Sequence, residues 1–308
     1  MTIVCATHFT DSSSDAVAVA THLARRTRQR LWLVTVLPGV PVGPSAEGPR
    51  RETTVNNALH LEASVVREQG VEVEVALLHG KMERAVGRLC DDVNARLLVV
   101  GDSSHNRPSL FATPVDRLAY GVSVPLLVVR NEKPFEAWAR GLAPLKVLLA
   151  IDHTWSSALA REWLAGLAVY GPLEVIATHI WSPVEEFARR GKRMPLTDAD
   201  EDSMAAMLMK ETEVALEDLP PNVTTRVQLE LGRGPIGMLL LDVAARERVD
   251  LMVLGSNPHK GVFSRLTSIS HEVLANSLMS VALIPGEGPM VGELARNPPP
   301  LPEITPHR

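Results

Sequence analysis

The chain has 308 residues, of which 45% are hydrophobic and 22% are charged, and its formal net charge is −5 at pH 7. This composition is typical of globular proteins, and the length suits about two domains of ordinary size. The negative charge and the aromatic content of 4% argue against a nucleic-acid binder, which normally needs a basic surface and stacking aromatic rings.

The first predicted strand, Thr2–Thr7 (TIVCAT), lacks the basic segment and long apolar core of a signal peptide. No apolar run in the chain approaches the length of a membrane span. The two cysteines, Cys5 and Cys90, lie in a strand-like run and a helical run, where they are expected to be small buried hydrophobes. These features predict a cytoplasmic protein.

The first half of the chain alternates predicted strands and helices. Apolar runs of strand length are bounded by polar turns and are followed by segments with the apolar spacing of a helix. In chain order, we expect a strand over Thr2–Thr7, a helix over Ser14–Thr27, a strand over Leu31–Leu37, an irregular insert over Pro38–Thr54, a helix over Val55–Gln69, and strands over Val71–Leu78 and Val124–Arg130.

The second half repeats the first. Three coincident offsets in matching patterns indicate an internal duplication. The pairs that share an offset of 154 positions are Gly80 and Gly234, Leu97 and Leu251, and Gly101 and Gly255.

The elements expected in the second half follow the same order. Strands that alternate with helices of this length predict a doubly wound α/β fold, in which helices cover both faces of a parallel sheet. The expected elements are strands over Lys146–Ile151, Leu173–Ile180, Thr224–Leu231, Leu251–Leu254 and Ser280–Pro285, helices over Ser157–Tyr170 and Ser203–Asp218, and an irregular insert over Trp181–Asp202.

Two domains are therefore expected, over residues 1–131 and 146–287, with a linker over 132–145. After Pro285 the chain is rich in proline and has no periodicity, which predicts a tail over residues 288–308.

The stretch Leu251–Pro285 carries the strongest indication of a ligand site. An apolar strand ends at Gly255, a loop rich in small and basic residues follows, and Ser268 or Ser270 offers an N-cap for the next helix. Backbone N–H groups and the helix dipole at such a helix start can hold an anion. Each residue also has a structural explanation, since glycine permits a positive φ and serine caps helices without any ligand.

In these motifs the chain resembles the universal stress protein family, in its tandem two-domain form. The resemblance is carried by Asp152 after the first strand of the second half, by the loop from Gly255 to Ser268, and by the closing strand Val124–Arg130 (VPLLVVR). It implies two Rossmann-like domains of the adenine nucleotide alpha hydrolase type, each with a five-stranded parallel sheet in the order 3-2-1-4-5.

Family members commonly dimerise through their last strand. Here Val124–Arg130 and Ser280–Pro285 are apolar enough to pair inside one chain, and each would otherwise be an exposed sheet edge. We therefore expect the two domains to form an intrachain pseudo-dimer, and a homodimer of the whole chain stays open.

The resemblance further implies a binding site for ATP or a related adenine nucleotide in the second domain. In nucleotide-binding members, adenosine lies beside the first two strands, and the phosphates lie on the glycine loop and the following helix start. Open parallel sheets also bind ligands outside the carboxyl ends of their strands, at the switch point. The positions that the resemblance implies are Ala150, Ile151, Asp152, Ile180, Gly255, Ser256, Gly261, Thr267, Ser268, Ile269 and Ser270.

The loop departs from the family motif at two glycines. Pro258 stands where the second glycine is expected and has no N–H to offer a phosphate. Thr267 replaces the third glycine, and a β-branched residue resists a positive φ. The loop is also one residue shorter than the motif, and Gly261 is expected to restore part of the lost flexibility.

The first domain departs further, so its site is expected to be degenerate. His8 stands where the second domain has Asp152, and Asp102 stands where it has Ser256. We expect Asp102 to repel a phosphate.

These features predict a stress-response protein that binds an adenine nucleotide in its second domain and acts by binding or signalling. No G-x-S-x-G elbow, G-x4-G-K-[ST] loop or metal-ligand histidine spacing occurs, so we do not expect an enzyme. The charge, the aromatic content and the short apolar runs predict no nucleic-acid partner and no membrane partner. A scaffold or partner-binding stress protein without nucleotide is the main alternative. A hydrolase or ligase is the weakest hypothesis, because DHTWSS follows strand one where such enzymes carry a glycine- and serine-rich loop.

The basic insert Ala188–Met194 is expected to be a solvated loop, although it follows strand two and lies within reach of the site.

Overall fold

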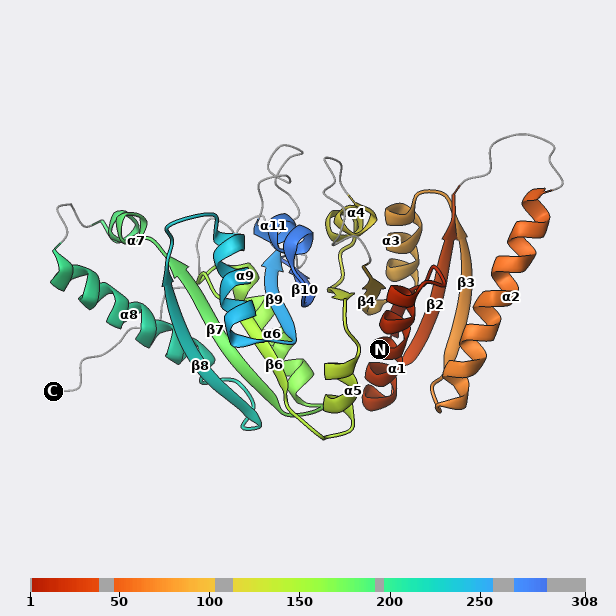
Figure 1. Cartoon of the computed structure of the whole chain (residues 1–308), viewed down its shortest axis with the longest axis horizontal. Coiled ribbons are helices and arrows are strands. Elements are labelled where there is room, and N and C mark those ends of the chain that lie inside the picture. Colours follow the sequence, from red (N-terminus) through yellow and green to blue (C-terminus); the bar gives the residue numbers. More distant parts are fainter. Residues whose placement is uncertain (1, 39–46, 103–112, 192–196, 257–268, 287–308) are drawn as a thin grey trace.

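The computed structural model of the chain describes residues 2–38, 47–102, 113–191, 197–256 and 269–286. Strands and helices alternate along both halves (Figure 1). The strands of the first half are β1 (Thr2–Ala6), β2 (Arg30–Leu37), β3 (Val73–His79), β4 (Ala95–Gly101) and β5 (Leu126–Val129), and those of the second half are β6 (Leu145–Ala150), β7 (Leu173–Trp181), β8 (Val223–Leu231), β9 (Leu251–Ser256) and β10 (Ser280–Pro285).

Helices follow the strands in the order that the sequence predicts. The helices of the first half are α1 (Asp11–Thr27), α2 (Glu47–Glu68), α3 (Met82–Asp92) and α4 (Pro114–Gly121), and α5 (Lys133–Ala139) lies between the halves. The helices of the second half are α6 (Trp155–Ala168), α7 (Pro183–Arg189), α8 (Asp198–Leu216), α9 (Ile236–Glu247) and α11 (Ile269–Asn276).

The ten strands that the structure describes belong to one continuous sheet in the order β3-β2-β1-β4-β5-β10-β9-β6-β7-β8 (Figure 1). Within each half the strands are parallel and follow the predicted order 3-2-1-4-5. The two halves do not form separate five-stranded sheets. They join at the β5–β10 junction, where these two strands pair antiparallel with Val128 opposite Val281. The doubly wound α/β fold is thus confirmed, and pairing of the two closing strands joins its halves within one chain.

Most of the core consists of two apolar layers on opposite faces of the sheet, because alternate strand residues point to opposite faces. Ile3 and Cys5 of β1 belong to one layer, together with residues of α1, α2, α5 and α6. Val4 and Ala6 belong to the other layer, together with residues of α3, α4, α9 and α11. Cys5 and Cys90 are both buried, and burial raises the pKa of the Cys90 thiol to about 12, so neither thiol is poised to react.

Three segments expected to be irregular contain helix. The insert after β2 includes the start of α2 at Glu47, and the insert after β7 includes α7 and the start of α8. Thr197 and Asp200 form a capping box that begins α8, a signal that sequence reading missed. The segment expected to be a linker contains α5, because Phe135 and Trp138 are buried on one helix face.

Within the described ranges, no helix is long and apolar enough to cross a membrane. The tail over 288–308 lies outside the described residues.

Candidate functional site

A cavity of about 130 Å³ lies at the carboxyl ends of β6, β7 and β9, at the switch point of the second half. Its wall combines one carboxylate and small polar groups with branched apolar side chains. The described residues that line it are Ala150, Ile151, Asp152, Ser156, Ser157, Thr178, Ile180, Ile236, Leu240, Leu254, Gly255 and Ile269.

Gly255, near the end of β9, is required by close packing against the start of α6. A Cβ on Gly255 would lie 2.8 Å from the Ser156 Cβ and closer than 3.0 Å to the Ser156 carbonyl group. Its φ is not positive, which corrects the conformational explanation considered for this glycine. Gly101 meets the backbone of Ser12 in the same way in the first half, so this motif glycine serves the fold in both halves.

Asp152 occupies the turn between β6 and α6. Its Oδ1 accepts hydrogen bonds from the Thr154 backbone N–H at 3.0 Å and from the Thr154 hydroxyl at 2.6 Å. Thr154 is the N-cap of α6 and receives the Ser157 N–H at 3.4 Å. Asp152 is exposed at the cavity, so it both stabilises the turn and presents a carboxylate to a ligand.

Two histidines, His153 and His179, pack against each other beside this turn. His179 is 3% exposed, and its Nδ1 lies 2.7 Å from the Ile151 carbonyl oxygen. The His153 ring lies 5.0 Å from the His179 ring, and His153 has a φ of 58°. Burial, reinforced by His179, lowers the pKa of His153. The backbone at Asp152 is therefore held by the hydrogen bond of His179 to Ile151 and by the packing of the two imidazole rings.

Six predicted site residues line the cavity, and two others do not. Ser256 and Ser270 are each 8% exposed, and the Ser256 hydroxyl donates to the Ile284 carbonyl at 3.4 Å. The residues at the cavity are Ala150, Ile151, Asp152, Ile180, Gly255 and Ile269, and those outside the described residues are Gly261, Thr267 and Ser268, together with Pro258.

Sequence reading missed half of the cavity wall. Ser156 and Ser157 follow Asp152 in the segment DHTWSS, which could have marked them as neighbours of the site. Ile236 and Leu240 stand four positions apart on α9, but helical spacing alone does not say which strand ends a helix faces.

The first half differs at the matched place. Asp102, 4% exposed, forms a 2.8 Å ion pair with Arg130, whose side chain is 1% exposed. This pair corrects the expectation that Asp102 would repel a phosphate, because the Arg130 guanidinium already neutralises the carboxylate. The matched positions in the second half are Ser256 and Pro285, which cannot form such a pair.

The start of α4 in the first half is already capped by a carboxylate. Asp116 Oδ2 accepts the Thr113 N–H and the Thr113 hydroxyl, both at 2.8 Å. A phosphate at this helix start would have to displace Asp116, which is 3% exposed. The matched residue of α11 is His271, so the two helix starts differ in charge.

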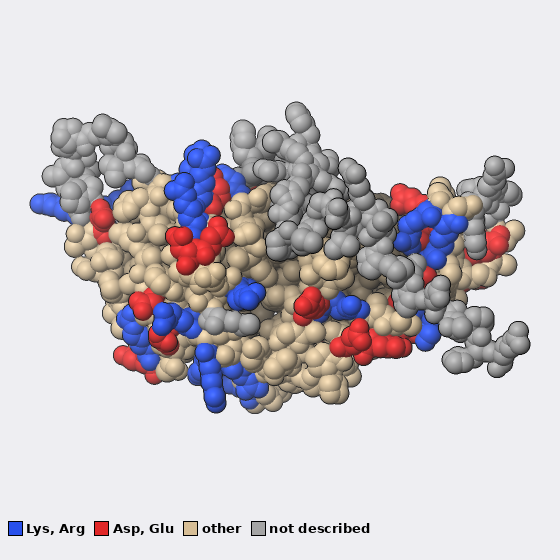
Figure 2. Space-filling model, turned by 180° about the vertical axis from the view of Figure 1, so that it is seen from behind, with Lys and Arg blue, Asp and Glu red and all other residues tan. Residues whose placement is uncertain are grey.

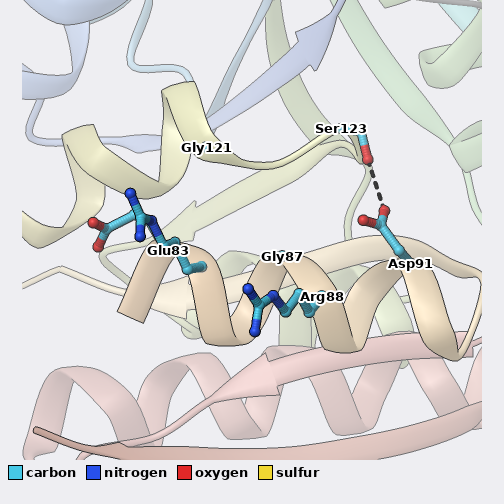
Figure 3. A pocket seen from close by; sticks show the side chains of 7 residues that line it. Glu83, Gly87, Arg88, Asp91, Gly121 and Ser123 are labelled. Atoms are coloured by element: carbon cyan, nitrogen blue, oxygen red, sulfur yellow. Dashed lines mark hydrogen bonds between the residues drawn. The ribbon is translucent and has the colours of Figure 1, made fainter. Parts of the chain in front are cut away.

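Two larger hollows lie between helices and include no strand end. One, of about 450 Å³, lies between α3 and α4, where Ser123 donates to Asp91 at 3.1 Å (Figure 3). Gly87 and Gly121 let the two helices approach closely there. The other, of about 460 Å³, lies at the matched place between α9 and α11. The first hollow contains the cations Arg84 and Arg88, but neither hollow lies at the carboxyl ends of the strands, where open parallel sheets bind ligands.

The charged residues near the cavity are largely paired. Arg189 binds Glu186 at 2.7 Å, and Arg190 binds Glu211 at 2.8 Å, so these two residues of the basic insert do not act as a solvated loop. On the back face that Figure 2 shows, basic and acidic side chains lie in small groups of both signs among other residues. Among the residues that the structure describes, no group of three or more His, Cys, Asp or Glu residues is arranged to hold a metal ion.

Comparison with known proteins gives a consistent result. The model of the Universal stress protein family matches twice, over residues 1–130 and 145–285. A universal stress protein A homolog from Pasteurella multocida is 27% identical over 140 residues, which cover 45% of this chain and 94% of that protein.

Solved structures share the fold of nearly the whole chain. A universal stress protein from Archaeoglobus fulgidus superposes with a TM-score of 0.63 at 15% identity, over 92% of this chain and 96% of that chain. A functionally unknown protein from Pseudomonas aeruginosa superposes with a TM-score of 0.59 at 16% identity, over 92% of both chains.

Proposed function

This chain belongs to the universal stress protein family, and from that premise we propose that it is a cytoplasmic stress-response protein that binds one adenine nucleotide, ATP or a close relative, in its second half. The proposed role is binding or signalling rather than catalysis. The observation that carries the proposal is the cavity at the switch point of the second half, which gathers six of the residues that the family resemblance implies.

The cavity is suited to the adenosine part of the ligand. Ile180, Leu254 and Ile236 supply apolar surface for a base, and Asp152 supplies an acceptor for ribose hydroxyls or for the adenine amine. At about 130 Å³ it is smaller than the 300–1,000 Å³ common for ligand sites, so it accommodates part of a nucleotide. The phosphates are then directed towards Ile269 and Ser270 at the start of α11, where helix N–H groups favour anions.

The proposal assigns no ligand to the first half. There Asp102 and Arg130 fill the end of β4 with a buried ion pair, and Asp116 occupies the start of α4. Displacing both carboxylates would cost more than a few hydrogen bonds to a phosphate return.

Titration calorimetry with ATP and AMP tests the proposal. We expect one site per chain, weakened about tenfold by Asp152→Ala, the effect of losing about one hydrogen bond to a charged group. Asp152→Asn keeps an acceptor for Thr154 and so separates the lost charge from the lost turn. His8→Ala, at the matched place of the first half, is the control and should bind as the wild type does.

Two other calorimetry results would contradict the proposal. Two equivalent sites would refute the asymmetry between the halves. No heat with either ligand would favour a scaffold that binds protein partners. The hydrogen bond from Thr154 to Asp152 Oδ1 supports this alternative, because it already gives the carboxylate a structural role.

Turnover of a bound nucleotide is expected to be slow or absent. Among the described residues of the cavity wall, Asp152 is the one carboxylate, and Thr154 already occupies one of its oxygens. Phosphate release should therefore stay at the level of a no-protein control, and release that Ser268→Ala abolishes would refute the binding role.

A further inference from the structure

The short helix α11 of the second half is held by side chains of the first half at both of its ends. At its C-terminal end, Arg130 Nη2 donates to the Leu274 carbonyl at 2.6 Å, and Arg130 Nη1 donates to the Met279 carbonyl at 3.1 Å. The Arg130 backbone N–H also donates to the Ser280 hydroxyl at 3.2 Å. One arginine thus bonds to three residues of the other half.

At the opposite end of α11, His271 Nδ1 lies 3.2 Å from Asp116 Oδ1. The two residues are matched positions of the duplicated halves, so they meet across the β5–β10 junction. Asp116 is in turn fixed by its hydrogen bonds with Thr113. The first turn of α11 therefore contacts a residue that cannot move freely.

The arginine itself is rigidly placed. Its guanidinium is 1% exposed and pairs with Asp102 at 2.8 Å, and charge-assisted bonds of this kind are the strong ones. In the second half the matched positions are Pro285 and Ser256, so no reciprocal clamp reaches back to α4 from them. The Arg130 contacts therefore connect the first half to α11 of the second half without a matching contact in the reverse direction among the described residues.

A helix of this length needs such support. α11 has eight residues, and helices shorter than about 12 residues are marginal without tertiary contacts. The apolar side chains that it buries are Val273 and Leu274, whereas Ile269 at its start is 37% exposed. α11 packs mainly against α9 of its own half, and the polar contacts with the first half fix its two ends.

From this geometry we infer that Arg130, held by Asp102, is a positioning residue for nucleotide binding: it fixes α11 so that the helix start meets the phosphates of the ligand in the second half. The inference rests on the proposed function. The Asp102–Arg130 ion pair would then have two effects: it closes the matched site of the first half and supports the proposed site of the second half.

Loss of the Arg130 contacts should affect ATP and adenosine differently, whereas general destabilisation of the chain would weaken binding of both. Adenosine would contact chiefly the ends of β6 and β7, with Ile269 the one residue of α11 in the cavity wall, whereas the phosphates would contact the helix start itself. Loss of the clamp should therefore weaken ATP binding about tenfold, as expected for one charge-assisted hydrogen bond, and leave adenosine binding nearly unchanged.

The test compares Arg130→Met with the double variant Arg130→Met/Asp102→Leu, which removes the clamp together with the buried carboxylate that Arg130 neutralises. Arg161→Met is the matched control, because Arg161 also donates to a helix-end carbonyl, that of Ala215, but does so within the second half. Two measurements are made on the full chain: hydrogen exchange of residues 269–276, and calorimetry with ATP and with adenosine.

We expect both clamp variants to exchange the α11 amides about tenfold faster than the wild type and to lose affinity for ATP but not for adenosine. Unchanged exchange in α11, equal losses for both ligands, or the same pattern in Arg161→Met would overturn the inference. A wild-type chain that binds neither ligand overturns the proposed function and, with it, the ligand role of Arg130, while the exchange measurement still decides whether Arg130 supports α11.

Discussion

Replacing Gly255 with alanine tests whether this motif glycine serves the fold. The added Cβ would lie 2.8 Å from the Ser156 Cβ, whereas ordinary contact begins at 3.4 Å, so β9 and the start of α6 must separate by more than about half an ångström. The Ser156 carbonyl group is also too close and cannot rotate away, because it belongs to the helix backbone. We expect Gly255→Ala to cost about 3 kcal/mol, at the upper end of typical overpacking.

Urea unfolding followed by circular dichroism measures this loss. Gly166→Ala is the control in the same helix, because its Cβ would meet nothing within 4 Å and alanine should stabilise the helix by about 0.5–1 kcal/mol. Equal stability of Gly255→Ala and the wild type would refute the packing explanation and return the glycine to a role in ligand binding alone.

Two further perturbations concern buried charge. Arg130→Met should lower the free energy of unfolding by about 3–5 kcal/mol, because it removes the guanidinium that neutralises the buried Asp102 carboxylate. The double variant Arg130→Met/Asp102→Leu should recover most of this loss in the same urea assay, and a double variant no more stable than Arg130→Met would contradict this explanation. Burial lowers the pKa of His153 below its ordinary value of about 6.5, so the unfolded chain takes up this proton first as pH falls, and stability should be lost below about pH 6.5. His153→Phe, which copies the matched Phe9, should flatten this loss in urea titrations between about pH 7.5 and 5.5, and parallel profiles of the two proteins would contradict the assignment.

The fold followed from sequence because its signals are local and repeated. Buried parallel strands such as Ser280–Pro285 read as continuous apolar runs, and the common offset of Gly101 and Gly255 revealed the duplication. Helix α5 was missed because seven residues with two buried aromatic side chains carry little periodic signal.

The candidate site was predictable only in part. Asp152 and Gly255 stand at strand ends, where topology alone predicts that their neighbours converge. The partner of Asp102 was not predictable, because Arg130 lies 28 positions away, at the end of a different strand. Whether a charge is isolated or paired depends on such contacts, and sequence spacing does not give them.

A crystal structure of the full chain grown with excess ATP tests the central claim most directly. The account predicts one nucleotide per chain, with its ribose or base within hydrogen-bond distance of Asp152 and its phosphates beside Ile269. An empty cavity at saturating ATP, or a nucleotide beside His8 in the first half, would contradict it.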